Sequence, residues 1–318
     1  MSTSLSSSHS STVLPPACVQ SHVSLASYTT FRVGGAAEWF CLPESADDLQ
    51  MALQWAADVG LATQFIGLGS NLLVSDRGIP GLTLCTRKLR ATKFLDNGQF
   101  WAAAGASVVK LSHAVADRGW SGWEWAVGVP GTVGGAVTMN AGAHGSSTAD
   151  SLVSVEILDE QLQHRTLYPD ELNYDYRYSI MQERNWIVTG ATVQLQEGDR
   201  DRIRQQTQAF WHKRHSTQPY DMPSCGSVFR NPHPKAAGWL IEQTGLKGYQ
   251  IGGAQVAQKH ANFILNSDRA RASDIHQLIA HVRQQVFDRW SIWLHPEVRV
   301  LGEFEVSGDC DMSMAIAD

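Results

Sequence analysis

The chain has 318 residues, of which 43% are hydrophobic and 18% charged, and its formal net charge is -6. This is the composition of an ordinary globular protein of about two domains, which excludes a disordered or fibrous chain. The mild acidity argues against a general nucleic-acid binder, which would carry a basic stripe. Five widely spaced cysteines without a C-x-x-C pair indicate a reducing compartment. No apolar run approaches the roughly 18 residues of a transmembrane helix.

The N-terminal part combines a serine-rich start with a first small unit. The start lacks a basic-then-apolar signal pattern, so we expect a disordered extension over 1–20 and no secretory signal. Residues 45–60 predict a helix that Ser45 caps, because apolar residues recur on one face. Short strands are expected around it at 63–66, 72–75 and 82–85. This unit spans about 21–90.

A second unit is expected over 91–200. A strand at 100–104 precedes a helix at 107–117, which Gly119 ends, and the densest glycine segment of the chain follows. Two later strands are expected at 153–158 and 186–195. The charged, glycine-containing break at 196–202 marks a domain boundary.

A third unit is expected over 201–304, followed by a tail at 305–318. Its best signal is the amphipathic pattern of 273–290, where Ile275, Leu278, Ile279, Val282 and Val286 share one face. The other expected elements are helices at 202–214 and 236–244 and strands at 224–230, 262–265 and 297–301.

Two glycine loops, 67–71 and 128–135, follow strands in the first two units. Such loops let main-chain N–H groups approach a phosphate closely. A dinucleotide fingerprint fails at the first loop, because Leu72 takes the third glycine position and a strand follows instead of a helix. A Walker A lysine-serine pair is also lacking. On spacing alone, a phosphate cradle and two tight turns remain equally open.

The motifs, taken together, resemble the UDP-N-acetylenolpyruvoylglucosamine reductase (UDP-N-acetylmuramate dehydrogenase) family, which makes UDP-N-acetylmuramate for the bacterial cell wall. The resemblance runs in order over about residues 25 to 304. Its motifs are the segments 30–35, 67–73, 128–136, 140–142, 174–179, 226–232, 247–254 and 296–299.

The resemblance implies an α+β fold and non-covalent FAD. A two-lobed FAD-binding domain of the vanillyl-alcohol-oxidase (PCMH) type would cover 21–200, and a smaller α+β substrate-binding domain would cover 201–304. This fold would explain why the dinucleotide fingerprint fails. The motif positions implied to contact FAD are Arg32, Gly67, Gly69, Ser70, Asn71, Gly128, Pro130, Gly131, Thr132, Gly134, Gly135, Asn140 and Ala141.

Reducing an enolpyruvyl ether requires a hydride, stabilisation of negative charge and a proton. Flavin supplies the hydride. The resemblance implies that Ser227 donates the proton and that Arg177 and Glu297 stabilise the enolate-like charge. From the residues alone, Ser227 is better explained as an ordinary turn hydroxyl. From the residues alone, Arg177 and Glu297 are likewise better explained as surface residues or as an ion pair with each other.

The implied substrate contacts are Arg214, Asn231, Lys259 and His260, although His260 could equally be a buried histidine with satisfied hydrogen bonds. The chain departs from one branch of the family. It lacks a tyrosine-bearing insertion after Arg177, and Gln218 stands where that branch has a substrate-binding lysine. We therefore assign the shorter, second type of the family.

The implied function is reduction of a UDP-sugar enolpyruvate with NADPH as co-substrate. We expect a cytoplasmic monomer without a metal, a nucleic-acid partner or membrane insertion. One alternative is an oxygen-using oxidase on the same flavin fold, with a covalent flavin link for which His144 is the candidate; acid precipitation would then leave flavin on the protein. Another alternative is a flavin- or nucleotide-binding regulator without catalysis.

Overall fold

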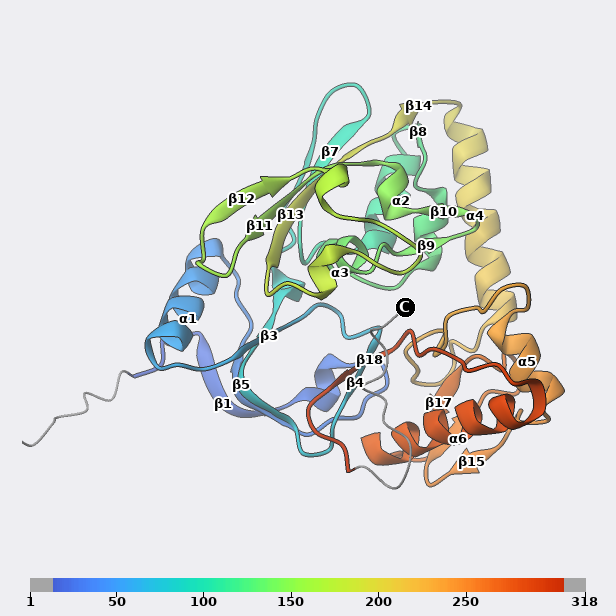
Figure 1. Ribbon diagram of the computed structural model, residues 1–318. Coiled ribbons are helices and arrows are strands. Elements are labelled where there is room, and N and C mark those ends of the chain that lie inside the picture. The colour runs from blue at the N-terminus through green and yellow to red at the C-terminus, as the bar shows by residue number, and fades with distance from the viewer. Residues whose placement is uncertain (1–13, 306–318) are drawn as a thin grey trace, which may run out of the picture.

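The structure, a computed structural model, describes residues 14–305. Figure 1 shows three groups of elements, coloured blue, green and orange to red, with one long yellow helix along a side of the molecule. Residues 1–13 and 306–318 lie outside the described range, and so do most of the predicted N-terminal extension and tail. No helix within 14–305 is long and apolar enough to cross a membrane.

The first lobe is a four-stranded sheet with one helix beside it. Its order is β1 (Val19–Ser24), β2 (Ala36–Cys41), β5 (Ile79–Cys85) and β3 (Thr63–Ile66), with β1 antiparallel and the other pairs parallel. Helix α1 (Ala46–Asp58) begins at a capping box in which Ser45 Oγ accepts from Asp48 N at 3.1 Å. Its buried Leu49 and Leu53 pack against the sheet. Because β1 begins at Val19, the predicted extension over 1–20 overlaps the sheet by two residues.

The second lobe is a five-stranded antiparallel sheet with helices α2 (Val108–Ala116) and α3 (Val133–Thr138). Ser107 caps α2, and Phe100 and Trp123 meet edge to face in the core. The sheet order is β12 (His164–Leu167), β11 (Leu152–Leu158), β13 (Ile187–Gln194), β7 (Gln99–Ala103) and β6 (Thr92–Phe94).

Smaller elements complete the two lobes. Short strand pairs join β8 (Trp120–Ser121) to β14 (Gln196–Glu197) and β9 (Gly142–Ala143) to β10 (Ser146–Ser147). The 3₁₀ helices are η1 (Leu25–Tyr28), η2 (Thr86–Lys88), η3 (Glu124–Gly128), η4 (Thr148–Asp150), η5 (Pro169–Glu171) and η6 (Ile180–Gln182).

The third unit packs α5 (Ala237–Gln243) and α6 (Ala272–Trp290) on a small sheet ordered β15 (Gln250–Ile251), β16 (Ala254–Val256) and β17 (Ile264–Asn266). The apolar face predicted for α6 is buried throughout. The strand predicted at 224–230 is wrong. Phe229 is joined to Pro296 by an isolated bridge, and the Asn262 side chain pairs with the main chain of Phe229 at 3.0 and 2.8 Å. A side-chain amide therefore replaces the neighbouring strand that the prediction required.

The long helix α4 (Arg200–Thr217) connects the second lobe to the third unit (Figure 1). Asp199 caps it, but its packing belongs mainly to the second lobe, where Phe210 lies against the core and stacks on His144 with ring centroids 4.0 Å apart. We therefore propose that the substrate domain begins near the end of α4, not at residue 201.

The first lobe and the third unit share one core, which contains Phe31 and Leu73 together with the buried face of α6. The closing strand β18 (Arg299–Leu301) pairs in parallel with β4 (Leu72–Val74) of the first lobe. The Asp76 carboxylate accepts from the first N–H groups of α6, Ala272 N at 2.8 Å and Ser273 N at 2.9 Å. These contacts bring Glu297, just before β18, next to the first glycine loop.

Candidate active site

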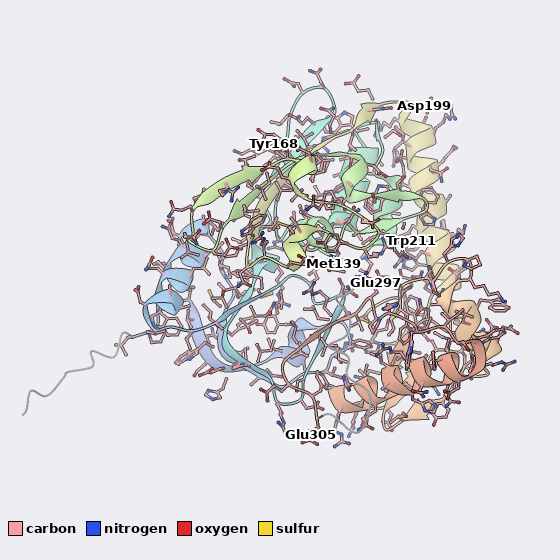
Figure 2. All side chains as sticks on the ribbon, in the orientation of Figure 1. Met139, Tyr168, Asp199, Trp211, Glu297 and Glu305 are labelled. Atoms are coloured by element: carbon pink, nitrogen blue, oxygen red, sulfur yellow. The ribbon has the colours of Figure 1, made fainter. Side chains whose placement is uncertain are left out.

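A cavity of about 430 Å³ lies where the three units meet. Both glycine loops, the Arg177 segment and the segment around Ser227 line it. Figure 2 labels two of its lining residues, Met139 of the second lobe and Glu297, both near the centre of the molecule in that view. The predicted site residues in the lining are Gly67, Gly69, Ser70, Asn71, Pro130, Gly131, Thr132, Gly134, Gly135, Ala141, Arg177, Arg214, Ser227, Asn231 and Glu297.

The two glycine loops, far apart in the sequence, form one wall of this cavity. Ser70 Oγ donates to Pro130 O at 2.5 Å. A Cβ atom at Gly67 would lie 2.5 Å from Thr132 Oγ1, so glycine permits the close approach of the loops. The first loop is a turn, whereas the second runs into α3 from its cap Thr132, and together they build a single surface.

This wall carries main-chain donors suited to a phosphate. Within 14–305, the N–H groups of Gly69, Ser70, Asn71 and Gly131 have no acceptor. Since successive main-chain N–H groups without a protein partner form an anion-binding concavity, these donors beside a cavity fit an anionic ligand. The structure thus offers a fit for the diphosphate of FAD that does not depend on basic side chains.

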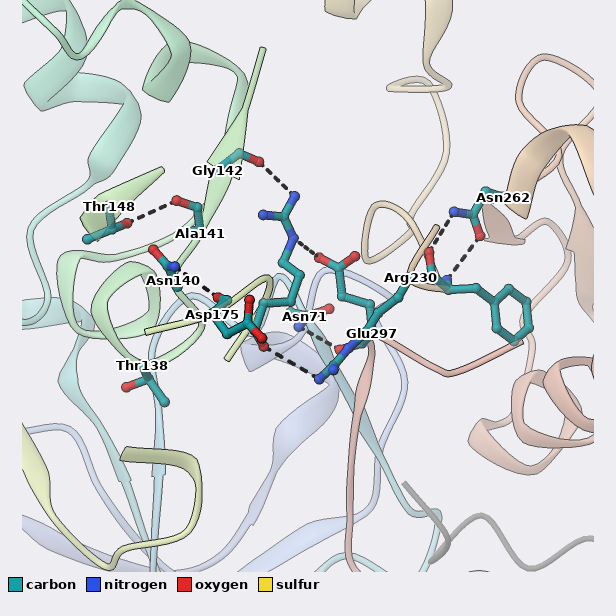
Figure 3. Close-up of polar contacts among 12 residues, drawn as sticks. Asn71, Thr138, Asn140, Ala141, Gly142, Thr148, Asp175, Arg230, Asn262 and Glu297 are labelled. Carbon is teal, nitrogen blue, oxygen red and sulfur yellow. Dashed lines mark hydrogen bonds and ion pairs between the residues drawn. The ribbon is translucent and has the colours of Figure 1, made fainter. Parts of the chain in front are cut away.

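Arg177 and Glu297 form an ion pair in the lining of the cavity, next to the first glycine loop. Arg177 Nε donates to Glu297 Oε1 at 2.9 Å, and Arg177 Nη2 donates to Gly142 O at 2.7 Å (Figure 3). The side chains are 20% and 18% exposed, so both are largely removed from solvent. The ion pair that the residues alone left open is therefore present, and both partners line the cavity.

The carboxyl group of Glu297 has a raised pKa. Burial raises it, and the guanidinium groups of Arg177, Arg230 and Arg214 oppose this effect without overcoming it. The Glu297 main chain is fixed to the first glycine loop, because Asn71 Nδ2 donates to Glu297 O at 3.0 Å (Figure 3). A carboxyl group with a raised pKa can remain protonated and donate a hydrogen bond to developing negative charge.

Ser227 lies beside Glu297 because their segments run next to each other. Glu297 N donates to Val228 O at 2.7 Å. Gly226 has φ +84°, and a Cβ atom there would have no neighbour within 4 Å, so the space next to Ser227 is open. The Ser227 hydroxyl has no hydrogen-bond partner within residues 14–305 and is free to donate to a bound molecule.

Two of the four predicted substrate contacts line the cavity and two do not. Arg214 and Asn231 line the cavity, where Arg214 Nε donates to Tyr220 OH at 2.6 Å and Asn231 Oδ1 accepts from Ala237 N at 3.0 Å. Lys259 and His260 lie outside its lining.

Lys259 is exposed, and its Nζ donates to His215 O at 2.9 Å. Burial lowers the pKa of His260, and its Nδ1 accepts from Asn262 N at 3.3 Å. Within residues 14–305 the main chain thus occupies one ring nitrogen of His260, and a substrate contact of this residue stays a prediction.

Three predicted FAD contacts also lie outside the lining. Arg32 is exposed. Gly128 packs against the Arg214 side chain, since a Cβ atom there would lie 2.8 Å from Cδ. Asn140 is buried, and its Nδ2 donates to Asp175 O at 2.9 Å (Figure 3), so it shapes the turn that leads to Arg177. His144, the candidate for a covalent flavin link, is likewise outside the lining and stacks on Phe210.

Gln182 and Arg299 are among the polar lining residues that the sequence prediction missed. Arg299 Nη1 donates to Gln182 Oε1 at 3.1 Å. Burial lowers the pKa of Arg299, and the positive charge of the neighbouring Arg230 lowers it further. Arg299 stood inside the 296–299 motif, so the signal was present, but only Glu297 was given a role there. Within 14–305, no group of three or more His, Cys, Asp or Glu side chains could hold a metal ion.

Comparison with known proteins identifies the family. The model for the C-terminal domain of UDP-N-acetylenolpyruvoylglucosamine reductase matches residues 218–301, and a model for an FAD binding domain matches 37–164. The reductase of Synechococcus sp. (strain JA-3-3Ab) is 54% identical over 288 residues, 90% of this chain and 92% of that protein. The chain belongs to the UDP-N-acetylenolpyruvoylglucosamine reductase family.

Two further relatives agree with this assignment. The reductase of Acaryochloris marina is 54% identical over 288 residues, 90% of this chain and 94% of that protein. The crystal structure of the reductase of Thermus caldophilus superimposes with a TM-score of 0.76 at 32% identity, covering 89% of this chain and 99% of that one. The chain is thus an oxidoreductase with an FAD-binding domain, and the predicted α+β fold of that type is confirmed.

Proposed function

We propose that the protein reduces UDP-N-acetylglucosamine enolpyruvate to UDP-N-acetylmuramate, with NADPH as the hydride source, in the cytoplasmic synthesis of peptidoglycan precursors. The observation that carries the proposal is the meeting of Arg177, Glu297 and Ser227 at one cavity that the two glycine loops also line. Family membership supports the same reaction. We propose further that the enzyme works as a monomer.

The two glycine loops would hold FAD without a covalent bond. The free N–H groups of Gly69, Ser70 and Asn71 suit its diphosphate. When bound, flavin supplies the hydride that no side chain can provide. Arg214 and Asn231, at the side of the cavity formed by the third unit and the end of α4, are the proposed contacts of the UDP-sugar.

The side chains around the cavity divide the remaining work. Arg177 orients the substrate carboxylate, because a guanidinium group binds carboxylates with two parallel hydrogen bonds. Glu297, in its protonated form, donates to the charge that develops on that carboxylate. Ser227 gives its hydroxyl proton to the substrate carbon next to the carboxylate and regains one from water.

Two anaerobic half-reactions test this function. Stopped-flow absorbance should show NADPH bleaching the flavin band, and the enolpyruvyl sugar nucleotide should then restore it in a one-to-one ratio. UDP-N-acetylglucosamine, which lacks the enolpyruvyl group, serves as the control and should leave the flavin reduced. Reoxidation by oxygen but not by the enolpyruvyl nucleotide would refute the proposal and favour an oxidase.

Replacing Glu297 tests its protonated role. The rate of substrate reduction should fall as pH rises through the raised pKa of Glu297, because the protonated form is the active one. Glu297→Ala should lower turnover by about 10²–10³-fold, as for other lost donors to a developing charge. Glu297→Gln keeps a neutral donor, so its turnover should fall less than that of Glu297→Ala. Because the amide does not titrate, the alkaline limb of its pH profile should disappear.

Glu303→Gln provides the matched control, since this carboxylate is exposed and pairs with Arg77 away from the cavity. Its pH profile should match that of the unaltered enzyme. An alkaline limb that persists in Glu297→Gln would show that another group controls it.

A further inference from the structure

The side-chain amide of Gln182 lies at the crossing of three segments that border the cavity. Its Nε2 donates to Arg177 O at 3.0 Å and to Thr138 O at 3.1 Å. Its Oε1 accepts from Arg299 Nη1 at 3.1 Å. Both amide hydrogens and the amide oxygen are therefore used. The three partners come from the end of α3, the Arg177 turn and β18.

The Arg177 turn needs such support because its backbone is unusual. Arg177 has φ +58°, a left-handed conformation that non-glycine residues adopt only when their surroundings fix it. The Arg177 carbonyl receives two side-chain donors, Gln182 Nε2 and Arg230 Nη2, the latter at 3.4 Å. Rotation of this peptide would carry the guanidinium group away from the cavity.

The same amide also reaches the strand that follows Glu297. Arg299 is two residues beyond Glu297, and its guanidinium group is held by Gln182. Arg177 belongs to the second lobe, whereas Glu297 and β18 are joined to the first lobe and the third unit. Gln182 therefore spans the boundary across which Arg177 and Glu297 must face each other.

We propose that Gln182 is a positioning residue: its amide sets the Arg177 guanidinium group against Glu297 by holding the Arg177 carbonyl on one side and Arg299 on the other. The inference rests on the proposed function for its kinetic consequence. This position requires an amide in particular. A glutamate could accept from Arg299 but could not donate to the carbonyls of Arg177 and Thr138, and a methionine of similar length could do neither.

The test compares Gln182→Met with Gln194→Met. Gln194 is a matched control because its Nε2 also donates to two carbonyls, Asn97 O at 2.7 Å and Leu195 O at 2.9 Å, but it lies in β13 outside the cavity lining. We expect kcat of Gln182→Met to fall by about 10²-fold, the scale of a small misplacement of catalytic groups. The content of bound FAD and the rate of its reduction by NADPH should stay unchanged, and Gln194→Met should be normal.

The pH profile distinguishes positioning from mere structural support. The Arg177 guanidinium group opposes the rise in the pKa of Glu297, so moving it away should raise that pKa further. The alkaline limb of Gln182→Met should shift to higher pH. Gln182→Glu, which keeps only the Arg299 contact, should be slow as well, and it serves as the second variant if the first does not fold.

Three outcomes decide the inference. Unchanged kcat and an unchanged pH profile in both Gln182 variants would overturn it, as would equal losses in Gln182→Met and Gln194→Met. A crystal structure of Gln182→Met provides a readout independent of turnover. Separation of Arg177 from Glu297 in that structure would support the inference, whatever the turnover. Failure of the unaltered enzyme to reduce the enolpyruvyl nucleotide would overturn the proposed function alone.

Discussion

Ser227→Ala should lower substrate turnover by orders of magnitude while bound flavin is still reduced by NADPH at the normal rate. The hydroxyl of Ser227 has no partner within residues 14–305, so its removal leaves no polar group unsatisfied and should not disturb the fold. Loss of a proton donor lowers turnover by about 10²–10⁴-fold. Anaerobic stopped-flow measures the two half-reactions separately, and the defect should appear only in the second.

Ser216→Ala is the control, because this hydroxyl donates to Lys213 O of its own helix at 2.9 Å and is exposed. It should behave as the unaltered enzyme. Ser227→Cys retains a proton that can be transferred and should recover part of the activity. Normal turnover of Ser227→Ala would remove Ser227 from the mechanism and leave water as the proton source.

The sequence predicted best those elements whose signal is local. Helix α6 was expected at 273–290 and occupies Ala272–Trp290, because a continuous apolar face fixes both its type and its length. Strand β1 was missed for the opposite reason. It is an edge strand with mostly exposed, polar side chains, so it has no apolar period.

In the site, too, the sequence predicted the local features and missed the contacts between distant segments. Glycine loops and short motifs are contiguous in the sequence, so they indicated most of the cavity lining. The bond from Arg177 to Glu297 joins residues 120 apart, and that from Gln182 to Arg299 joins residues 117 apart. No local pattern encodes such pairs, because they depend on how the second lobe meets β18.

The charge of the cavity lining is opposite in sign to the net charge of the chain. A protein with a net charge of -6 repels anionic nucleotides overall, so local groups must attract them. Among the lining residues within 14–305, Glu297 is the one acid, while Arg177, Arg184, Arg214 and Arg299 contribute positive charge. The cavity is therefore electropositive inside an acidic protein.

Gly69→Ala should destabilise the first lobe and empty the flavin site. Gly69 has φ +66°, and a Cβ atom there would lie 2.0 Å from Tyr28 O, a main-chain atom that cannot turn aside. The Gly69 carbonyl also accepts from Thr30 N at 3.1 Å, so any shift of the loop breaks this bond. We expect a loss of more than about 4 kcal/mol in the free energy of unfolding, as for other severe steric substitutions.

Gly60→Ala isolates the cost of the backbone conformation. Gly60 has φ +70°, nearly that of Gly69, but a Cβ atom there would have no neighbour within 4 Å. Its substitution should cost only the left-handed strain of alanine, about 1 kcal/mol, and should leave FAD bound. Thermal unfolding and the ratio of flavin to protein after purification measure both effects. Equal behaviour of the two variants would mean that conformation, not the contact with Tyr28, requires glycine in the first loop.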